Sequence, residues 1–195
     1  TPFGDGIVDV NDLEVLMSYW GQGFYDPHFI AHWTLDETEG NMAHDSITEN
    51  DAIVMGDAQW QVDLGHVDGA LQLDGVNDYV EAPFLLNPKE SIFSVFAWIK
   101  GSEPGQTILS QEDGTSWLLT DDQGCLMTAL TGDGRQSGDP LCSDVIVTDD
   151  SWHRIGLVWD GSYRSLYVDD VLVATDVGVQ NNFAACEGKL IMGAA

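Results

Sequence analysis

Short apolar runs separated by polar turn residues occupy most of the chain. From residue 29 onward these runs are rich in Val, Ile, Phe, Tyr and Trp, and clusters of Gly, Asp, Asn and Pro divide them. Many short strands without an intervening helix are typical of an antiparallel sandwich or barrel. The strands that we expect are residues 29–35, 52–55, 70–73, 79–82, 93–99, 107–110, 116–120, 126–130, 144–147, 153–159, 165–168, 171–175 and 190–193. Asp160-Gly161 and Asp169-Asp170 lie between apolar runs and predict tight hairpin turns.

The segment 93–99 alternates large and small side chains, so the two sides of the predicted strand can be assigned. One side carries Phe93, Val95 and Ala97, and the other carries Ser94, Phe96 and Trp98. Both sides hold apolar side chains, which is typical of a central strand in a sandwich.

The beginning of the chain has a different period. The four residues Leu13, Leu16, Met17 and Trp20 follow helical spacing, and this predicts one short N-terminal helix over residues 11–20. Gly21 ends the pattern. We therefore place a boundary within residues 21–27 and expect a small segment, 1–26, before a β domain at 27–195.

The net charge argues against some partners. Six Lys and Arg against 33 Asp and Glu give the 195 residues a formal charge of −27, which repels nucleic acid and anionic membrane surfaces. The 44% of apolar residues suffice for a core, and no apolar run approaches the length of a membrane span. The carboxylates either form a solvating shell or bind Ca²⁺ in clusters, and composition leaves both open.

The three cysteines are too few for a disulfide framework. Cys125 and Cys142 flank a turn-rich run, and a hairpin-like return there would bring them together as a bridge and leave Cys186 free. Whether this bridge forms is not determined by the sequence.

Four stretches resemble the laminin-G-like jelly-roll domain of the concanavalin-A-like lectin/glucanase superfamily. They read AHWTLDE with HDS at 31–37 and 44–46, GALQLDGVNDYV at 69–80, FSVFAWI at 93–99, and SWHRIGLVWDG at 151–161. The resemblance implies an all-β fold, a two-sheet antiparallel jelly-roll sandwich, in which Trp33, Trp98 and Trp159 are large enough to bridge the core. The family usually has one further strand after the position of Gly193. We therefore expect residues 190–193 to lie beside an exposed sheet edge or a symmetry partner, which would allow a homo-oligomer.

Residues 5–13, DGIVDVNDL, resemble the second half of a dockerin-like calcium loop, with the predicted helix after it. The resemblance makes Asp5, Asp9 and Asp12 candidate Ca²⁺ ligands. Thr1 and Phe3 stand where the family has acidic or amide side chains. A calcium-free capped helix is the alternative.

A second calcium site is implied by the superfamily, some members of which carry Ca²⁺ at the rim of the sandwich. The candidate ligands are Asp36, Glu37, Asp45 and Asp78. They lie in different loops, and a hard cation needs several oxygen donors that converge. The alternative is that these carboxylates cap turns by accepting backbone hydrogen bonds.

Glycan recognition needs an exposed aromatic platform, and Trp60, Trp117 and Tyr163 are the candidates because alternation does not commit them to the core. Partial burial at a sheet edge is the alternative for each.

The chain lacks the E-x-D-x-E run of laminarinase-type glycoside hydrolases, so we do not expect an enzyme. The sequence favours a non-catalytic extracellular or cell-surface module that binds glycan, with Ca²⁺ as a possible cofactor. The alternative is an adhesion or assembly module that binds an extracellular protein through the helix face of Leu13, Leu16 and Trp20.

Overall fold

The computed structural model describes residues 29–112, 116–131, 139–177, 183, 185 and 188–194. The chain divides into two units, Thr1–Ile30 and Ala31–Ala195, and the second holds nearly all of the described residues. The predicted helix over 11–20 and the candidate calcium ligands Asp5, Asp9 and Asp12 lie outside the described residues. No helix in the described part is long and apolar enough to span a bilayer.

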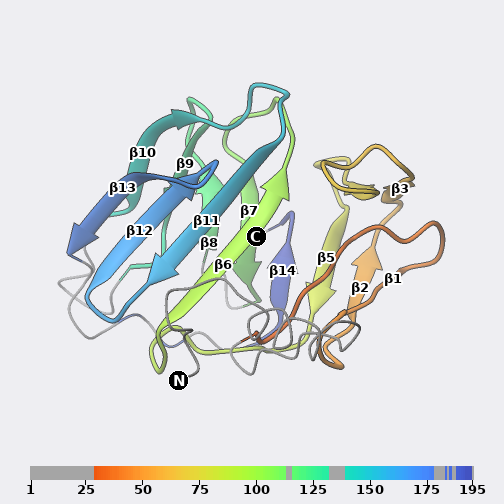
Figure 1. Ribbon diagram of the computed structural model, residues 1–195, viewed down its shortest axis with the longest axis horizontal. Helices are drawn as coiled ribbons and strands as arrows, with labels where there is room; N and C mark the ends of the chain where they lie inside the picture. The colour runs from red at the N-terminus through yellow and green to blue at the C-terminus, as the bar shows by residue number, and fades with distance from the viewer. Residues whose placement is uncertain are drawn as a thin grey trace, which may run out of the picture. The chain divides into compact units, whose positions relative to one another are not determined.

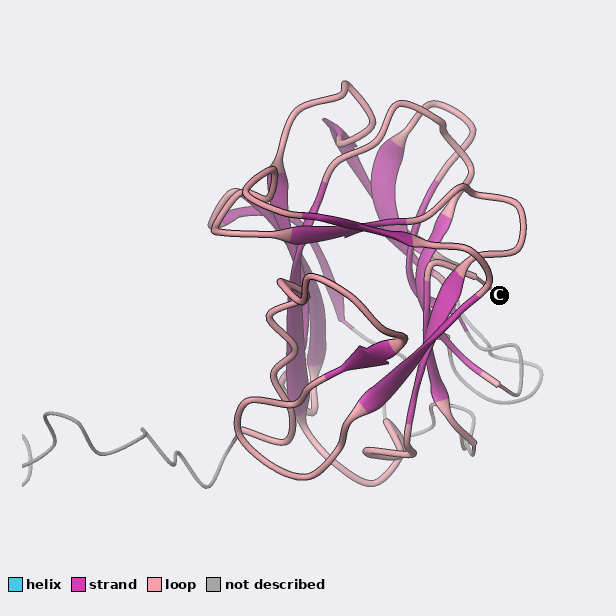
Figure 2. Ribbon diagram, turned by 90° about the vertical axis from the view of Figure 1, so that its right-hand side faces the viewer, coloured by secondary structure: helices cyan, strands magenta, loops and turns pink. Residues whose placement is uncertain are grey.

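Antiparallel sheets make up the fold, and the described residues contain no helix (Figures 1 and 2). The larger sheet has the order β1 (Met42–Ala43), β2 (Ala52–Met55), β5 (Tyr79–Ala82), β14 (Leu190–Met192), β7 (Thr107–Gln111), β8 (Ser116–Thr120), β9 (Cys125–Thr128) and β10 (Leu141–Ile146). The second sheet has the order β13 (Val171–Val177), β12 (Tyr163–Val168), β11 (His153–Trp159) and β6 (Phe93–Ile99). A short pair, β3 (Gln59–Gln61) and β4 (Ala70–Gln72), forms the third. The all-β antiparallel sandwich predicted from the sequence is confirmed.

The core lies between the two large sheets, because alternate side chains of their strands point inward. Ile155 and Leu157 on β11 and Leu166 on β12 are fully buried, and each such side chain stabilises the fold by roughly 1.5–3 kcal/mol. Phe93 of β6 contacts Trp117 of β8, with ring centroids 5.0 Å apart, so this aromatic pair joins one sheet to the other.

Arg164 lies on the inner side of β12 and is only 1% exposed. Its Nε donates to Oδ1 of Asp176, the residue directly opposite on β13, at 3.0 Å, and its Nη2 donates to Oδ2 of the same carboxylate. The guanidinium also donates to the carbonyl oxygens of Leu130 at 2.7 Å and Asp139 at 3.0 Å. A buried cation is tolerated when it is paired and hydrogen-bonded in this way.

The tight turn between β12 and β13 forms as predicted. Asp169 and Asp170 have φ angles of 50° and 66°, the left-handed values that a two-residue hairpin turn of this type requires. The predicted strand at 29–35 is not formed, and its described residues make a single isolated bridge, Trp33 to Asp45.

Two predictions about strand positions are wrong. β14 pairs with β5 on one side and β7 on the other, so the segment 190–193 has both of its neighbours within the chain. β6 is not central, because among the described strands it pairs only with β11. The outward side chain of Trp98 is exposed, so Trp98 does not bridge the core as the buried Trp159 does.

Candidate ligand-binding face

The outer side of β6 exposes large aromatic side chains. Phe96 is 40% exposed and Trp98 is 42% exposed, while Phe93 on the other side of the strand is buried. Contiguous exposed aromatic surface on a soluble protein is characteristic of a binding site. Figure 1 shows β6, β11, β12 and β13 in front of β7, β8 and β9 of the larger sheet.

Phe96 is placed by the residue opposite it. Its register partner on β11 is Gly156, which in turn pairs with Tyr167 on β12. Because Gly156 has no side chain, the Phe96 ring lies over the backbone, where a Cβ would come within 2.2 Å of it. The ring centroids of Phe96 and Tyr167 are 6.2 Å apart, so two aromatic rings meet above one glycine.

Arg154 borders these rings. Its guanidinium carbon lies 4.5 Å from the Phe96 centroid, in the geometry of a cation–π contact. It also forms an ion pair with Asp170 in the β12–β13 turn. The backbone N–H of Arg154 donates to Oδ1 of Asp169 at 2.9 Å, and this fixes the turn beside the strand.

Trp98 is covered on one ring face by a histidine. His66, in the loop between β3 and β4, stacks on Trp98 with centroids 3.5 Å apart and an interplanar angle of 19°. The ring of Trp152 lies 6.4 Å from His66. We call Phe96, Trp98, Tyr167, Arg154 and His66 together the aromatic face.

The three aromatics predicted from the sequence have different positions. Tyr163 is 47% exposed and lies four residues before Tyr167 on β12, hence on the same side of the sheet. Trp117 is 3% exposed and its Nε1 donates to Gln111 at 3.3 Å, so its prediction as a ligand platform is wrong. Trp60 is half-buried on β3 and packs against the core, with Nε1 donating to the Gly40 carbonyl at 2.8 Å.

The sequence already contained part of the signal for the aromatic face. Alternation places Phe96 and Trp98 on one side of their strand. It does not show that this strand is at a sheet edge, nor that this side faces solvent.

The predicted calcium ligands Asp45 and Asp78 are buried and bonded to backbone amides. Asp45 accepts from the N–H groups of His32 at 2.9 Å and Ile47 at 3.0 Å. Burial alone would raise the pKa of Asp45, but its hydrogen bonds, including one from the Thr48 hydroxyl, outweigh this and lower the pKa. Asp78 accepts from the N–H groups of Asp57 at 2.7 Å and Asp74 at 3.1 Å. Both residues therefore act as turn caps.

The other two candidate calcium ligands are Asp36 and Glu37, and each has a separate hydrogen-bond partner. Asp36 is exposed and accepts from the Thr34 hydroxyl at 2.6 Å. Glu37 accepts from the N–H of His44 at 2.7 Å through Oε1, while its buried Oε2 has no partner in the described part. No group of three or more His, Cys, Asp or Glu side chains that could hold a metal occurs among the described residues. The predicted convergence of Asp36, Glu37, Asp45 and Asp78 on one ion is not found.

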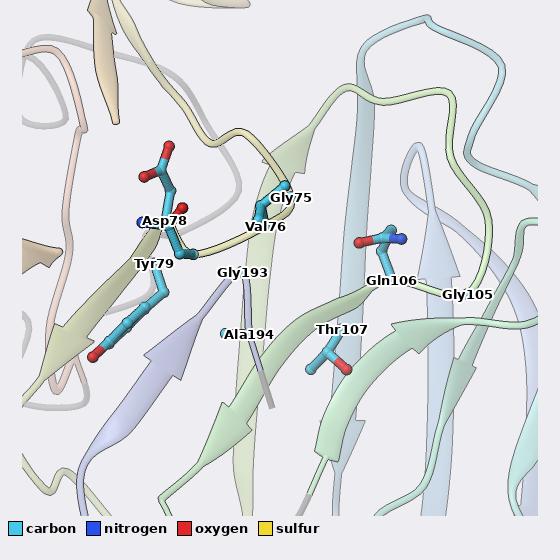
Figure 3. A pocket seen from close by; sticks show the side chains of 10 residues that line it. Gly75, Val76, Asp78, Tyr79, Gly105, Gln106, Thr107, Gly193 and Ala194 are labelled. Carbon is cyan, nitrogen blue, oxygen red and sulfur yellow. The ribbon is translucent and has the colours of Figure 1, made fainter. Parts of the chain in front are cut away.

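A cavity of about 430 Å³ opens at the rim of the sandwich (Figure 3). Residues 75–79, 105–107 and 193–194 line it. The Asp78 carboxylate and the Tyr79 ring point away from Gly193 and Gln106 in this view, and Asp78 holds its own turn. Backbone and short side chains thus form much of the lining, which gives the cavity fewer directed groups than the aromatic face has.

Family and structural comparisons agree with this fold. A laminin-G-type family model, described as the concanavalin A-like lectin/glucanases superfamily, matches residues 74–195. The chain belongs to this family. No curated protein sequence matches this laminin-G-like chain.

Solved structures resemble the laminin-G-like chain at low sequence identity. The binding domain of Paraclostridial Mosquitocidal Protein 1 has a TM-score of 0.64 and 14% identity, over 80% of this chain and 42% of that one. The binding domain of botulinum neurotoxin DC in complex with SialylT has a TM-score of 0.62 and 13% identity, over 84% and 43%. Domain 4 of AbnA, a GH43 extracellular arabinanase from Geobacillus stearothermophilus in complex with arabinotriose, has a TM-score of 0.57 and 14% identity, over 85% and 82%. This chain thus spans less than half of the two toxin domains, and the likeness concerns the fold.

Proposed function

We propose that the chain is a non-catalytic, extracellular carbohydrate-binding module whose ligand stacks on the aromatic face. One observation carries the proposal. Phe96 and Trp98 are both exposed on the outer side of β6, and the Phe96 ring lies next to that of Tyr167 on the same side of the sheet. Flat aromatic rings offer large apolar area at low entropic cost, and a sugar ring has an apolar C–H face that fits them. Polar groups of Arg154, Asp170 and His66 border the rings and can orient hydroxyl groups.

The neighbours by fold support the choice of ligand. One is a domain of an extracellular arabinanase in complex with arabinotriose, and another is a toxin binding domain in complex with SialylT. A non-catalytic role is supported by the missing E-x-D-x-E run, because glycoside hydrolysis requires a pair of carboxyl groups across the scissile bond. The carboxylate of Asp170, beside the rings, is engaged by Arg154.

The test is a glycan array with the purified chain, followed by titration calorimetry on the best ligand. We expect Trp98→Ala and Phe96→Ala each to weaken binding at least tenfold, which corresponds to about 1.4 kcal/mol. Phe84→Ala is the matched control, because Phe84 is an exposed phenylalanine outside the aromatic face, at 51% exposure. Binding to no glycan, or unchanged binding by both face variants, would contradict the proposal.

Calcium can be tested in the same assay. The aromatic face contains no group of metal ligands in the described part of the chain, so we expect a chelator to leave glycan binding unchanged. Loss of binding with the chelator would instead show that an ion holds the ligand, and would contradict recognition by stacking alone.

Protein binding is the second candidate, and the loop between β3 and β4 favours it. Val62, Leu64 and Val67 of this loop are exposed apolar side chains. If the array is negative and Leu64→Asp abolishes binding to a purified extracellular partner while Trp98→Ala does not, the protein-binding interpretation replaces the glycan one.

A further inference from the structure

The charges around the aromatic face determine which glycans it can accept. We propose that the face binds neutral glycans and rejects those that carry carboxylate or sulfate groups. This inference rests on the proposed glycan-binding function and specifies its ligand class.

Arg154, the cation of the aromatic face, already has an acidic partner. The Arg154 guanidinium is paired with Asp170 and lies against the Phe96 ring. An acidic sugar would have to displace Asp170 before it could form the bidentate contact that arginine makes with carboxylates. Lys100, directly after β6, has its Nζ 3.9 Å from Oδ1 of Asp150, so it too has an acidic partner.

Aspartates gather at the end of the sheet where Trp98 and Arg154 pair. Asp169 and Asp170 form the β12–β13 turn, which is held beside β11 by the bond from the Asp169 N–H to the Arg154 carbonyl at 2.8 Å. Asp149 and Asp150 precede β11, and the Asp150 N–H donates to the carbonyl of Gly101, just beyond β6, at 3.0 Å. Four carboxylates thus surround one arginine, one lysine and one histidine, His153, which is itself bonded to Asp149 and Asp169.

The local charges and the whole molecule act in the same direction. The formal charge of the chain is −27, so an anionic ligand is repelled at long range as well as at the face. Like charges at this surface repel one another, and salt at about 0.1 M screens this repulsion beyond about 10 Å. Neutral sugars avoid this repulsion and keep the full benefit of stacking.

The experiment uses pairs of related glycans in which one member carries more acidic groups than the other. The pairs are N-acetyllactosamine and its sialylated form, methyl-esterified and unesterified galacturonan, and chondroitin and its sulfate. We expect at least tenfold stronger binding of the less acidic member in each pair that binds, and a smaller difference at 0.5 M NaCl than at low salt.

Two variants with the same change in net charge separate local from general effects. Asp170→Asn releases Arg154 and removes one carboxylate from the face, so we expect it to reduce the discrimination several-fold. Asp122→Asn changes an exposed carboxylate in the turn between β8 and β9 of the other sheet, and we expect it to leave the discrimination close to that of the original chain.

The outcomes distinguish the two proposals. Preference for the acidic members, or equal effects of the two variants, would overturn the neutral-ligand inference and leave the glycan-binding function standing. Failure to bind any glycan, on the array or in these pairs, would overturn the function, and the inference with it.

Discussion

The Phe96 ring occupies the space that a side chain at Gly156 would need, since a Cβ there would lie 2.2 Å from the ring. Gly156→Ala should therefore push the exposed ring away, at a cost on the order of 1 kcal/mol in the free energy of unfolding. Urea denaturation measures this cost. Glycan binding should fall as far as it does in Phe96→Ala, because the displaced ring no longer stands beside Tyr167.

A double-mutant cycle tests the coupling between the two positions. In a Phe96→Ala background the clash is gone, and Gly156→Ala should stabilise the strand slightly, since glycine is unfavourable within a strand. The sign of the alanine effect is thus expected to reverse. Additive costs would show that the ring does not depend on the glycine.

We expect replacement of Asp176 to destabilise the fold, because Asp176 is the ion-pair partner of the buried Arg164. Asp176→Asn leaves the charge of Arg164 buried without its ion-pair partner, so we expect a loss of about 3 kcal/mol in the free energy of unfolding. The value lies at the lower end for buried pairs because the Asp176 side chain is 35% exposed. Thr175→Ala, which removes a 3.2 Å contact with Ser165 on the outer side of the sheet, is the control and should cost about 1 kcal/mol or less. A loss below the control value at Asp176 would show that this ion pair does not stabilise the fold.

His153 predicts a pH dependence of stability. Its Nδ1 lies 2.8 Å from Asp169 and its Nε2 lies 3.1 Å from Asp149, and both nitrogens can donate only when the ring is charged. Burial opposes this charge, but the hydrogen bonds to both carboxylates outweigh it and raise the pKa of His153. Because the pKa is higher in the folded state, the charged His153 ring stabilises the folded protein, and this stabilisation is complete below the unfolded pKa of 6.5. It is lost as pH rises through the folded-state pKa.

Asp149 and Asp169, the partners of His153, determine how this stabilisation changes at acid pH. The pKa of Asp149 lies below the usual 3.8, chiefly because its carboxylate accepts a hydrogen bond from the Ser151 N–H. The pKa of Asp169 is also lowered, chiefly by its hydrogen bond with His153. The stability that these carboxylates contribute is therefore lost as pH falls through their folded-state pKa values. His153→Gln should therefore reduce stability more at pH 5.5 than at pH 9, as measured by urea denaturation. In an Asp149→Asn/Asp169→Asn background this pH difference should disappear. An equal loss at both pH values would argue for packing alone.

The cysteines are expected to react at very different rates. Cys125 is buried and Cys142 is exposed, and both are free. The bridge that the sequence left open is therefore not formed, and Cys142 is opposite Met127 in the β9–β10 register. Burial, followed by the nearby carboxylates of Asp121 and Asp144, raises the pKa of the Cys125 thiol. In a Cys186→Ser variant, a thiol reagent should label one group at once and the second only after unfolding. Two fast-reacting thiols would contradict the burial of Cys125.

Local sequence signals predicted the strands better than their order. Residues 52–55, 79–82 and 153–159 form strands with the predicted bounds, because their alternation and flanking turns are local properties. β1 and β3 were not predicted, since two or three residues are too few to show a period.

The candidate site depended on information that no local pattern contains. Trp117 and Trp98 both lie in strands with large side chains, yet one is buried between the sheets and the other faces solvent. Which side of β6 faces the core is set by packing against the larger sheet, as in the contact of Phe93 with Trp117, and these residues are far apart in the chain. The burial of Arg164 gave no signal either, because the Leu130 and Asp139 carbonyls that accept from it lie 34 and 25 residues away in the chain.

The place of β14 between β5 and β7 has a consequence for biosynthesis. β14 joins β1, β2 and β5 to β7, β8, β9 and β10, and it is the most C-terminal of the described strands. A ribosome adds about 5–20 residues per second, and it must make nearly all of the described chain before β14 can pair with β5 and β7. Until then two partial sheets expose pairing edges to the crowded cell, and we expect late, slow folding that benefits from chaperones.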